Sequence, residues 1–120
     1  MSPSYLLKNA TIVNEGCVFV SDLFIKNGRI EKIASEINVQ EKCETIDLEE
    51  KLLLPGCIDD QVHFREPGLT DKADISTESY AAIAGGITSY MEMPNTVPNT
   101  LTQELLQNKY EIAKQNSYAN

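Results

Sequence analysis

The sequence PGCIDDQVHFREPG, residues 55–68, decides the fold, because a run of strand-forming residues ends here in a charged segment and a Pro-Gly turn. The run CIDDQVHF, residues 57–64, predicts a β-strand. Successive side chains of a strand point to opposite faces, so polar groups at every second position share one face. These groups are Asp59, Gln61, His63 and Arg65. Such groups are costly to bury without partners, so this face is the predicted functional site.

Strands and helices alternate after this segment. Residues 75–84 (ISTESYAAIA) predict a helix that Asp74 caps and Gly85-Gly86 ends, and residues 87–94 (ITSYMEMP) predict a second strand. Residues 102–116 (TQELLQNKYEIAKQN) predict a second helix capped by Thr102. This order is typical of a parallel sheet, whose active sites lie at the carboxyl ends of the strands. Residues 55–120 therefore predict the first two β/α units of an incomplete (β/α)₈ barrel, which takes ~250 residues when whole.

Residues 1–54 predict a separate β unit. Three strand-like segments, SYLLKNATIVN, CVFVSDLFIKN and GRIEKIA, are followed by a short strand around Thr45 to Leu48. The Asn27-Gly28 pair between the second and third segments is a strong signal for a type I′ hairpin turn. We expect an antiparallel unit that forms part of a small β-sandwich. Together with the β/α units of residues 55–120, this makes the expected fold class of the whole chain α/β. The alternative for residues 1–54 is a β-domain of no particular function.

Composition narrows the class of protein. The 120 residues include 10 Lys and Arg against 18 Asp and Glu, a formal net charge of −8, which weighs against a nucleic-acid or anionic-membrane partner. No apolar run approaches the ~18 residues of a membrane-spanning helix, and the first residues lack a signal-peptide pattern. The three cysteines have no paired spacing, which favours a reducing cytoplasm, and Cys57 is expected to be buried.

His63, the only histidine, is the best candidate metal ligand. Zinc sites use three or four His, Cys or carboxylate ligands, so Asp59 and Asp60 are possible additions and Gln61 is a weak neutral donor. The alternative for His63 is a surface or satisfied core residue without a ligand.

Arg65 carries a planar guanidinium that suits a carboxylate, and its alternative role is a salt bridge to Glu66 or Asp71. Asn95 follows the second strand on the same expected rim as Arg65, where its amide either holds a substrate carboxylate or caps its own loop. Glu92 has no partner in the sequence pattern, and we assign it no role.

The segment PGCIDDQVHFREPG, together with AAIAGGITSYMEMPNT, resembles the amidohydrolase superfamily and, within it, the dihydroorotase family. FIKNGRIEKI and IDLEEKLLLPG fit the same pattern, so the resemblance covers essentially the whole chain but only the N-terminal part of a typical member. It implies a (β/α)₈ barrel with a β-sandwich built from both chain ends. The implied activity is zinc-dependent, with one or two ions, and interconverts dihydroorotate and N-carbamoyl-aspartate in pyrimidine biosynthesis.

The resemblance also implies roles for individual residues. His63 matches the second histidine of a D-x-H-x-H motif and would bind metal, while Asp59 matches its leading aspartate, a supporting or compensating group. Arg65 matches the arginine that grips the substrate carboxylate, and Asn95 matches the asparagine that assists it. Gln61 stands where the family has its first histidine, which leaves the metal count open. The general acid/base and the other ligands would lie beyond residue 120, so no catalytic residue is expected within 1–120.

Two other functions stay open at this point. One is another cyclic amidohydrolase of the allantoinase or hydantoinase type, whose substrates lack the carboxylate that Arg65 would bind. The other is a non-catalytic pseudo-enzyme subunit, which Gln61 favours. In each case we expect the 120-residue chain to be inactive alone and, with open sheet edges, to self-associate or to need the missing C-terminal portion.

Overall fold

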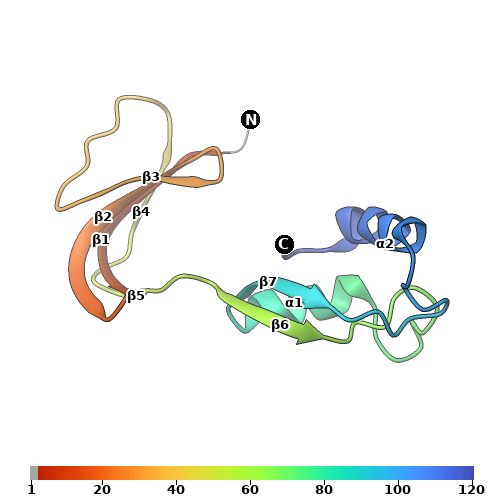
Figure 1. Cartoon of the computed structure of the whole chain (residues 1–120). Helices are drawn as coiled ribbons and strands as arrows, with labels where there is room; N and C mark the ends of the chain where they lie inside the picture. The colour runs from red at the N-terminus through yellow and green to blue at the C-terminus, as the bar shows by residue number, and fades with distance from the viewer. Residues whose placement is uncertain (1–2) are drawn as a thin grey trace. The chain divides into compact units, whose positions relative to one another are not determined.

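The computed structural model describes residues 3–120, which form two compact units that divide between Pro55 and Gly56 (Figure 1). The first unit contains strands only, and the second contains two strands and two helices. The prediction of a mixed α/β chain is therefore confirmed, while the sandwich and the barrel stay predictions.

The first unit is a five-stranded sheet with the strand order β3-β2-β1-β4, in which β5 also pairs with β1. The strands are β1 (Tyr5–Asn14), β2 (Cys17–Lys26), β3 (Arg29–Ala34), β4 (Glu44–Asp47) and β5 (Leu52–Leu53). β1, β2 and β3 are antiparallel, as expected. β4 and β5 instead pair parallel to β1, so the expectation of an all-antiparallel unit is wrong. The loop over residues 35–43 carries the chain across the sheet, which lets β4 run in the direction of β1.

Two local features set the register of this sheet. Asn27 and Gly28 have φ values of 52° and 73°, so the predicted turn with two positive φ angles is confirmed. A register shift in β1 lies between Leu7 and Ala10, and the buried carboxylate of Asp22 accepts the Asn9 amide at 3.0 Å there. The second oxygen of Asp22 accepts the amide of Ile37, also at 3.0 Å. Asp22 therefore joins the irregular part of β1 to the loop after β3.

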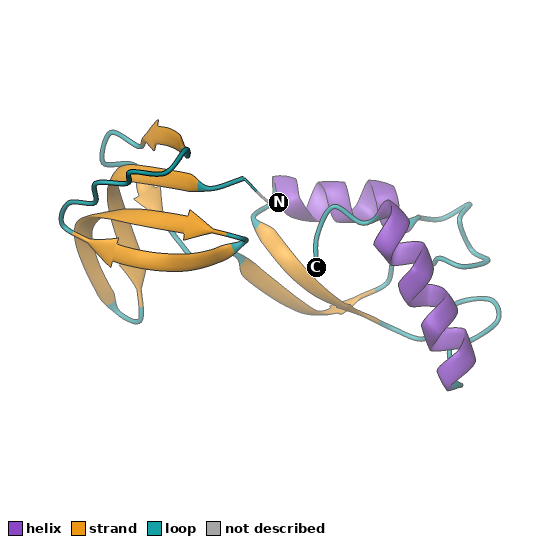
Figure 2. Cartoon of the chain, turned by 90° about the horizontal axis from the view of Figure 1, so that it is seen from above, coloured by secondary structure: helices purple, strands orange, loops and turns teal. Residues whose placement is uncertain are grey.

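The second unit is a parallel pair of strands with two helices (Figure 2). Its elements are β6 (Cys57–Val62), α1 (Ile75–Ala84), β7 (Ile87–Glu92) and α2 (Gln103–Asn116). Both predicted N-caps are confirmed: Asp74 accepts the amide of Thr77 at 2.8 Å, and Thr102 accepts the amide of Leu105 at 3.3 Å. Neither helix in the described part of the chain is long and apolar enough to cross a membrane.

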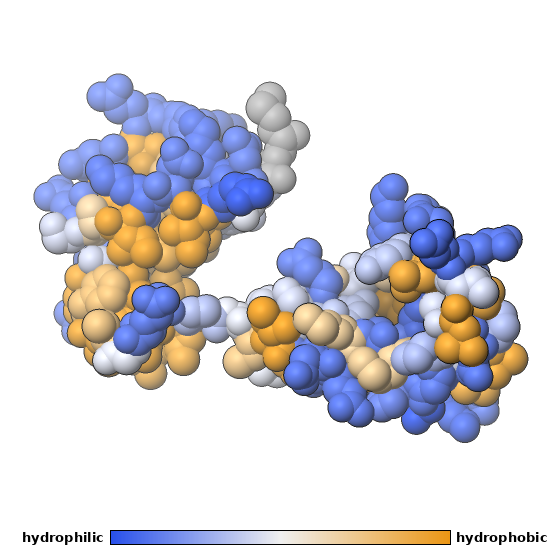
Figure 3. Space-filling model, in the orientation of Figure 1, coloured by the Kyte–Doolittle hydropathy of each residue, from blue (hydrophilic) through white to orange (hydrophobic). Residues whose placement is uncertain are grey.

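The helices cover one face of this two-stranded sheet. Its core consists of Val62, Phe64 and Ile75, against which residues of β7 and α2 pack. The side chains that alternate with these core residues point to the other face of the sheet and are exposed. They include Gln61, His63 and Met91. Figure 3 shows apolar side chains on the surface of both units.

Two expectations about β6 are wrong. The strand ends at Val62 rather than at residue 64, because the chain leaves the extended conformation soon afterwards and Arg65 has φ 68°. Cys57 is exposed rather than buried, as is its neighbour Ile58. Neighbouring strand residues face opposite sides, so the beginning of β6 is uncovered on both faces within this unit.

Candidate functional site

The structure brings His63 and Asn95 into direct contact. His63 follows β6 and Asn95 lies three residues after the end of β7, so both are at the carboxyl ends of parallel strands. His63 Nδ1 lies 2.9 Å from Asn95 Oδ1, a hydrogen bond that joins positions 32 residues apart. The side chain of Asn95 therefore takes part in an interaction between the two strand ends.

This hydrogen bond fixes the protonation pattern of the histidine. A carbonyl oxygen only accepts, so His63 Nδ1 must carry the proton that it shares with Asn95 Oδ1. In the neutral imidazole the lone pair then lies on Nε2. His63 is exposed, and its Nε2 is the ring atom prepared to bind a metal ion or accept a proton.

Arg65 lies in the loop that follows β6. It is half-buried, and in residues 3–120 no carboxylate oxygen lies within 4.0 Å of its guanidinium. Glu66, one of its two considered partners, instead accepts the amide of Ile75 at 2.9 Å at the start of α1. The salt bridge of Arg65 to Glu66 or Asp71 is thus not formed, and the guanidinium is able to bind another anion.

The loops after Arg65 and Asn95 are packed backbone to backbone. The amide of Val97 donates to the carbonyl of Pro67 at 3.0 Å. Gly68 has φ 88°, and a Cβ placed on it would lie 2.0 Å from the carbonyl oxygen of Val97. Only glycine allows this close approach, which holds the two loops in register with each other.

Asp59 and Gln61 are held together by a local hydrogen bond. Asp59 is half-buried on β6, and its Oδ1 accepts the amide of Gln61 at 3.1 Å. The described residues contain no group of three or more His, Cys, Asp or Glu side chains placed to hold a metal ion. With one imidazole and no second strong ligand beside it, the donor set does not make a complete zinc site.

A buried ion pair that the sequence analysis missed supports the end of β6. Glu92, the last residue of β7, accepts the amide of Phe64 at 3.0 Å with Oε1 and forms an ion pair with Lys109 through Oε2. Phe64 lies between His63 and Arg65, so Glu92 fixes the backbone that presents both side chains. Lys109 also donates to the carbonyl of Met93 at 3.0 Å, which ties α2 to the end of β7.

Lys109 had a recognisable signal in the sequence. It occupies the middle of the apolar stripe of α2, with Leu105 four positions before it and Ile112 and Ala113 three and four positions after it. A charged residue in such a stripe is buried and needs a partner of opposite charge. Burial lowers the pKa of Lys109 below its usual value.

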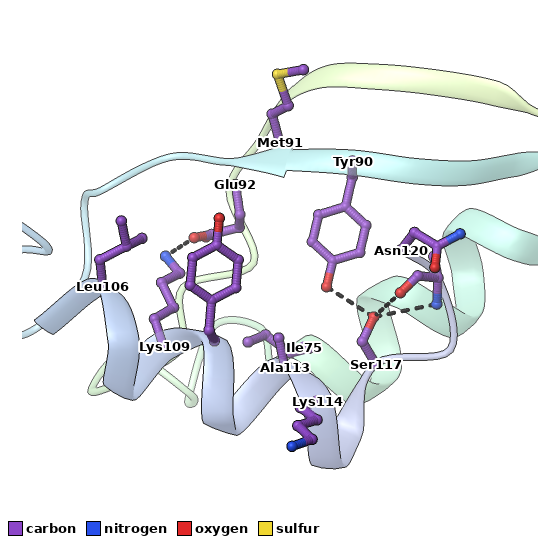
Figure 4. A pocket seen from close by; sticks show the side chains of 12 residues that line it. Ile75, Tyr90, Met91, Glu92, Leu106, Lys109, Ala113, Lys114, Ser117 and Asn120 are labelled. Atoms are coloured by element: carbon purple, nitrogen blue, oxygen red, sulfur yellow. Dashed lines mark hydrogen bonds and ion pairs between the residues drawn. The ribbon is translucent and has the colours of Figure 1, made fainter. Parts of the chain in front are cut away.

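A cavity of about 540 Å³ lies elsewhere, between β7 and α2, and none of the predicted site residues lines it. Its walls are formed by Ile75, Tyr90, Met91, Glu92, Leu106, Lys109, Tyr110, Ala113, Lys114, Ser117, Ala119 and Asn120 (Figure 4). The site around His63 and this cavity are therefore two separate features of the second unit.

Comparisons with known proteins place the chain in a family. Residues 50–118 match the family model described as Dihydro-orotase-like. The dihydroorotase of Pediococcus pentosaceus is 44% identical over 99 residues, which are 82% of this chain and 23% of that protein. The dihydroorotase of Bacillus cytotoxicus is 38% identical over 118 residues, 98% of this chain and 27% of that protein.

Solved structures give the same picture. The L-hydantoinase (dihydropyrimidinase) of Arthrobacter aurescens superposes with a TM-score of 0.90 at 29% identity, covering 97% of this chain and 26% of that chain. The chain thus spans about a quarter of the length of the relatives that it matches. The family match over more than half of the residues decides the assignment: this chain belongs to the dihydroorotase-like family of cyclic amidohydrolases.

Proposed function

We propose that this chain is the N-terminal segment of a metal-dependent dihydroorotase that interconverts dihydroorotate and N-carbamoyl-aspartate in pyrimidine biosynthesis. In this proposal residues 1–54 are part of a β-sandwich, and residues 55–120 are the first two β/α units of a (β/α)₈ barrel. The observation that carries the proposal is the hydrogen bond between His63 and Asn95, which joins two motif residues at the carboxyl ends of neighbouring parallel strands. The three free cysteines support a reducing, cytoplasmic location.

Arg65 and Asn95 are the proposed substrate-binding residues. Dihydroorotate carries a carboxylate, and Arg65 has a guanidinium with no carboxylate partner in the described chain. A guanidinium binds a carboxylate through two parallel hydrogen bonds, which fixes the orientation of the substrate as well as its affinity. Asn95 uses its Oδ1 for His63, so its Nδ2 is the atom left to donate to the same substrate.

His63 is the proposed zinc ligand of this segment, through Nε2. When bound, zinc would polarise the amide carbonyl and activate a water molecule. Gln61 offers at most a weak neutral oxygen, and Asp59 already accepts a backbone amide, so these two are supporting groups. The remaining ligands and the general acid/base must come from polypeptide outside these 120 residues, and the chain alone is expected to be inactive.

Specific residues distinguish two alternative functions from the proposed one. The structural likeness to L-hydantoinase, with its TM-score of 0.90, favours a hydantoinase-type substrate, but such a substrate offers no carboxylate to Arg65. Gln61 in the place of the family's first histidine favours a non-catalytic subunit. An experiment on substrate preference and metal content therefore distinguishes the three functions.

The test is a chimera in which this chain replaces the matching segment of the Pediococcus pentosaceus dihydroorotase. We expect hydrolysis of dihydroorotate and none of an unsubstituted hydantoin. Arg65→Lys in the chimera should raise KM for dihydroorotate by about 10- to 150-fold, equivalent to ~1.5–3 kcal/mol of binding. Metal analysis and a Gln61→His chimera are the controls. Preference for the hydantoin would support the first alternative, and a folded chimera that binds no zinc and turns over neither substrate would support the second.

A further inference from the structure

The loop between β7 and α2 is built around a buried hydroxyl group. Thr96 is 1% exposed, although the three residues that follow it, 97–99, are exposed. It comes directly after Asn95, the residue that contacts His63. Because a buried polar group without a partner is costly, the hydrogen bonds of this hydroxyl show what it holds in place.

The Thr96 hydroxyl connects two later parts of the same loop. Its Oγ1 lies 2.8 Å from the carbonyl oxygen of Pro98 and 2.9 Å from Oγ1 of Thr100. A hydroxyl has one proton and a carbonyl oxygen only accepts, so Thr96 donates to Pro98 and accepts from Thr100. The carbonyl of Pro94, at 3.4 Å, is the more distant acceptor. With a donor and an acceptor at fixed places, the β-branched side chain is held in one rotamer.

The backbone around Asn95 is closed by the same residues. The amides of Thr96 and Thr100 both donate to the carbonyl of Pro94 at 2.9 Å. The first of these bonds joins residues two positions apart, which makes Asn95 the central residue of a γ-turn. The peptide unit between Asn95 and Thr96 is planar, so anchoring Thr96 through its amide and its hydroxyl also fixes the Cα atom of Asn95.

The contact between Asn95 and His63 depends on this anchoring. Asn95 Oδ1 lies 2.9 Å from His63 Nδ1, and in the part of the chain that the structure describes the Asn95 side chain makes no other hydrogen bond. No other polar group therefore restores its direction when the backbone turns. Hydrogen bonds weaken steeply when the angle or the distance changes, so a small rotation at Asn95 loses the acceptor of the Nδ1 proton.

We propose that Thr96 is a positioning residue of the candidate site: its buried hydroxyl sets the direction of Asn95 and, through Asn95, the tautomer of His63. The backbone bond between Val97 and Pro67 fixes where the loop lies, whereas the hydroxyl fixes the turn inside it. This first part of the proposal depends only on the hydrogen bonds of the loop. A second part rests on the proposed function: the same anchoring directs Asn95 Nδ2 to the substrate carboxylate.

The first test measures the ¹⁵N shifts of the neutral His63 ring in the 120-residue chain. Thr96→Val removes the hydroxyl with little change of shape, and we expect the ring shifts to move toward those of the form protonated at Nε2, as in Asn95→Ala. Thr96→Ser keeps the hydroxyl and should retain the parent shifts. Thr102→Val is the matched control: it removes the N-cap of α2 and leaves the hydrogen bonds of Thr96 in place, so the shifts should not change.

The outcomes of this test are distinct. A change in Thr96→Val that is absent from Thr96→Ser and Thr102→Val supports the proposal. Parent-like shifts in folded Thr96→Val, or an equal change in either of the other two variants, overturn it. Should Thr96→Val fail to fold, three-bond couplings report the χ1 angles of Thr96 and Asn95 in the parent chain. A single rotamer at both residues, with parent-like His63 shifts in Thr96→Ser, then supports the proposal. Averaged couplings at either residue, or changed shifts in Thr96→Ser, overturn it.

The second test follows the kinetics of the chimera with the Pediococcus pentosaceus dihydroorotase. Thr96→Val should raise KM for dihydroorotate about tenfold, the effect of losing one hydrogen bond to a charged group, and Thr96→Ser should leave KM within about twofold. An unchanged KM in Thr96→Val overturns the second part of the proposal. A parent chimera that does not hydrolyse dihydroorotate overturns the proposed function and this second part with it, while the tautomer of His63 still decides the first part.

Discussion

Lys109 on α2 forms an ion pair with Glu92 at the end of β7, and the two side chains are only 9% and 7% exposed. Glu92 also accepts the amide of Phe64, so one carboxylate links both strand ends to the helix. A buried charge that loses its partner is strongly destabilising, whereas replacement of the whole pair is often tolerated. This arrangement predicts how single and double variants of the pair differ.

Lys109→Met should lower the free energy of unfolding by ~3–5 kcal/mol, because it leaves the Glu92 carboxylate buried without a counter-charge. Addition of Glu92→Gln should restore a large part of the loss, since glutamine still accepts the Phe64 amide. Urea unfolding followed by tyrosine fluorescence measures both values. Lys114→Met, at an exposed position of the same helix, is the matched control and should change stability by less than ~0.5 kcal/mol. Equal losses at Lys109 and Lys114 would contradict the role of the pair.

Asn95→Ala should remove the preference of the His63 ring for the tautomer that is protonated at Nδ1. The Asn95 side-chain oxygen accepts the Nδ1 proton of His63. Without this oxygen, the ring proton moves to Nε2 in part of the molecules. His63 is the only histidine, so the long-range ¹⁵N spectrum of the ring can be assigned without ambiguity. Asn95→Asp keeps an acceptor and should preserve the Nδ1-protonated form. An Asn95→Ala spectrum identical to that of the parent would show that the contact is not formed in solution.

Gly68→Ala should separate the two loops of the candidate site. A Cβ there would lie 2.0 Å from the Val97 carbonyl oxygen, and the left-handed backbone disfavours it as well, at a combined cost of about 2–5 kcal/mol. Gly28→Ala is the matched control, since Gly28 has φ 73° and no atom within 4 Å, so only the ~1–2 kcal/mol backbone cost applies. Chemical denaturation gives both values. Equal costs would mean that the loops are not in contact.

Asp22→Ala should destabilise the first unit by ~2–4 kcal/mol, because it leaves the amides of Asn9 and Ile37 without acceptors. Asp22→Asn keeps one acceptor oxygen and should cost less. The measurement is hydrogen exchange at the two amides together with urea unfolding. Glu31→Ala, at an exposed position of β3, is the control. Unchanged exchange at both amides in Asp22→Ala would exclude this role.

Acid should weaken α1 through its N-cap. The hydrogen bond from the Thr77 amide is the main reason why the pKa of Asp74 is lowered below its usual value. A carboxyl group with a lowered folded-state pKa contributes stability above its unfolded-state pKa of ~3.9, and the contribution is lost as the pH falls through the folded value. The Thr77 amide shift should therefore titrate with a midpoint below ~3.9. Asp74→Asn keeps the cap and should abolish that titration, and a midpoint at or above ~3.9 would refute the shift.

The sequence by itself determined the local elements of this chain. The turn at Asn27-Gly28, the caps at Asp74 and Thr102 and both helices follow the sequence pattern, because each depends on backbone conformations and hydrogen bonds within a few consecutive residues. The sequence motifs also identified the family. Exposed and buried side chains alternate as expected from Gln61 to Phe64, and the alternation fails at Arg65, where the backbone takes a positive φ.

Only the tertiary structure decided the long-range relationships. The contact of His63 with Asn95 spans 32 positions, and the ion pair of Glu92 with Lys109 joins a strand to a helix. The parallel pairing of β4 with β1 also depends on where the chain returns to the sheet. Such contacts arise from packing and from the pairing of distant strands, and short-range patterns do not encode which distant partner satisfies a given backbone group or charge.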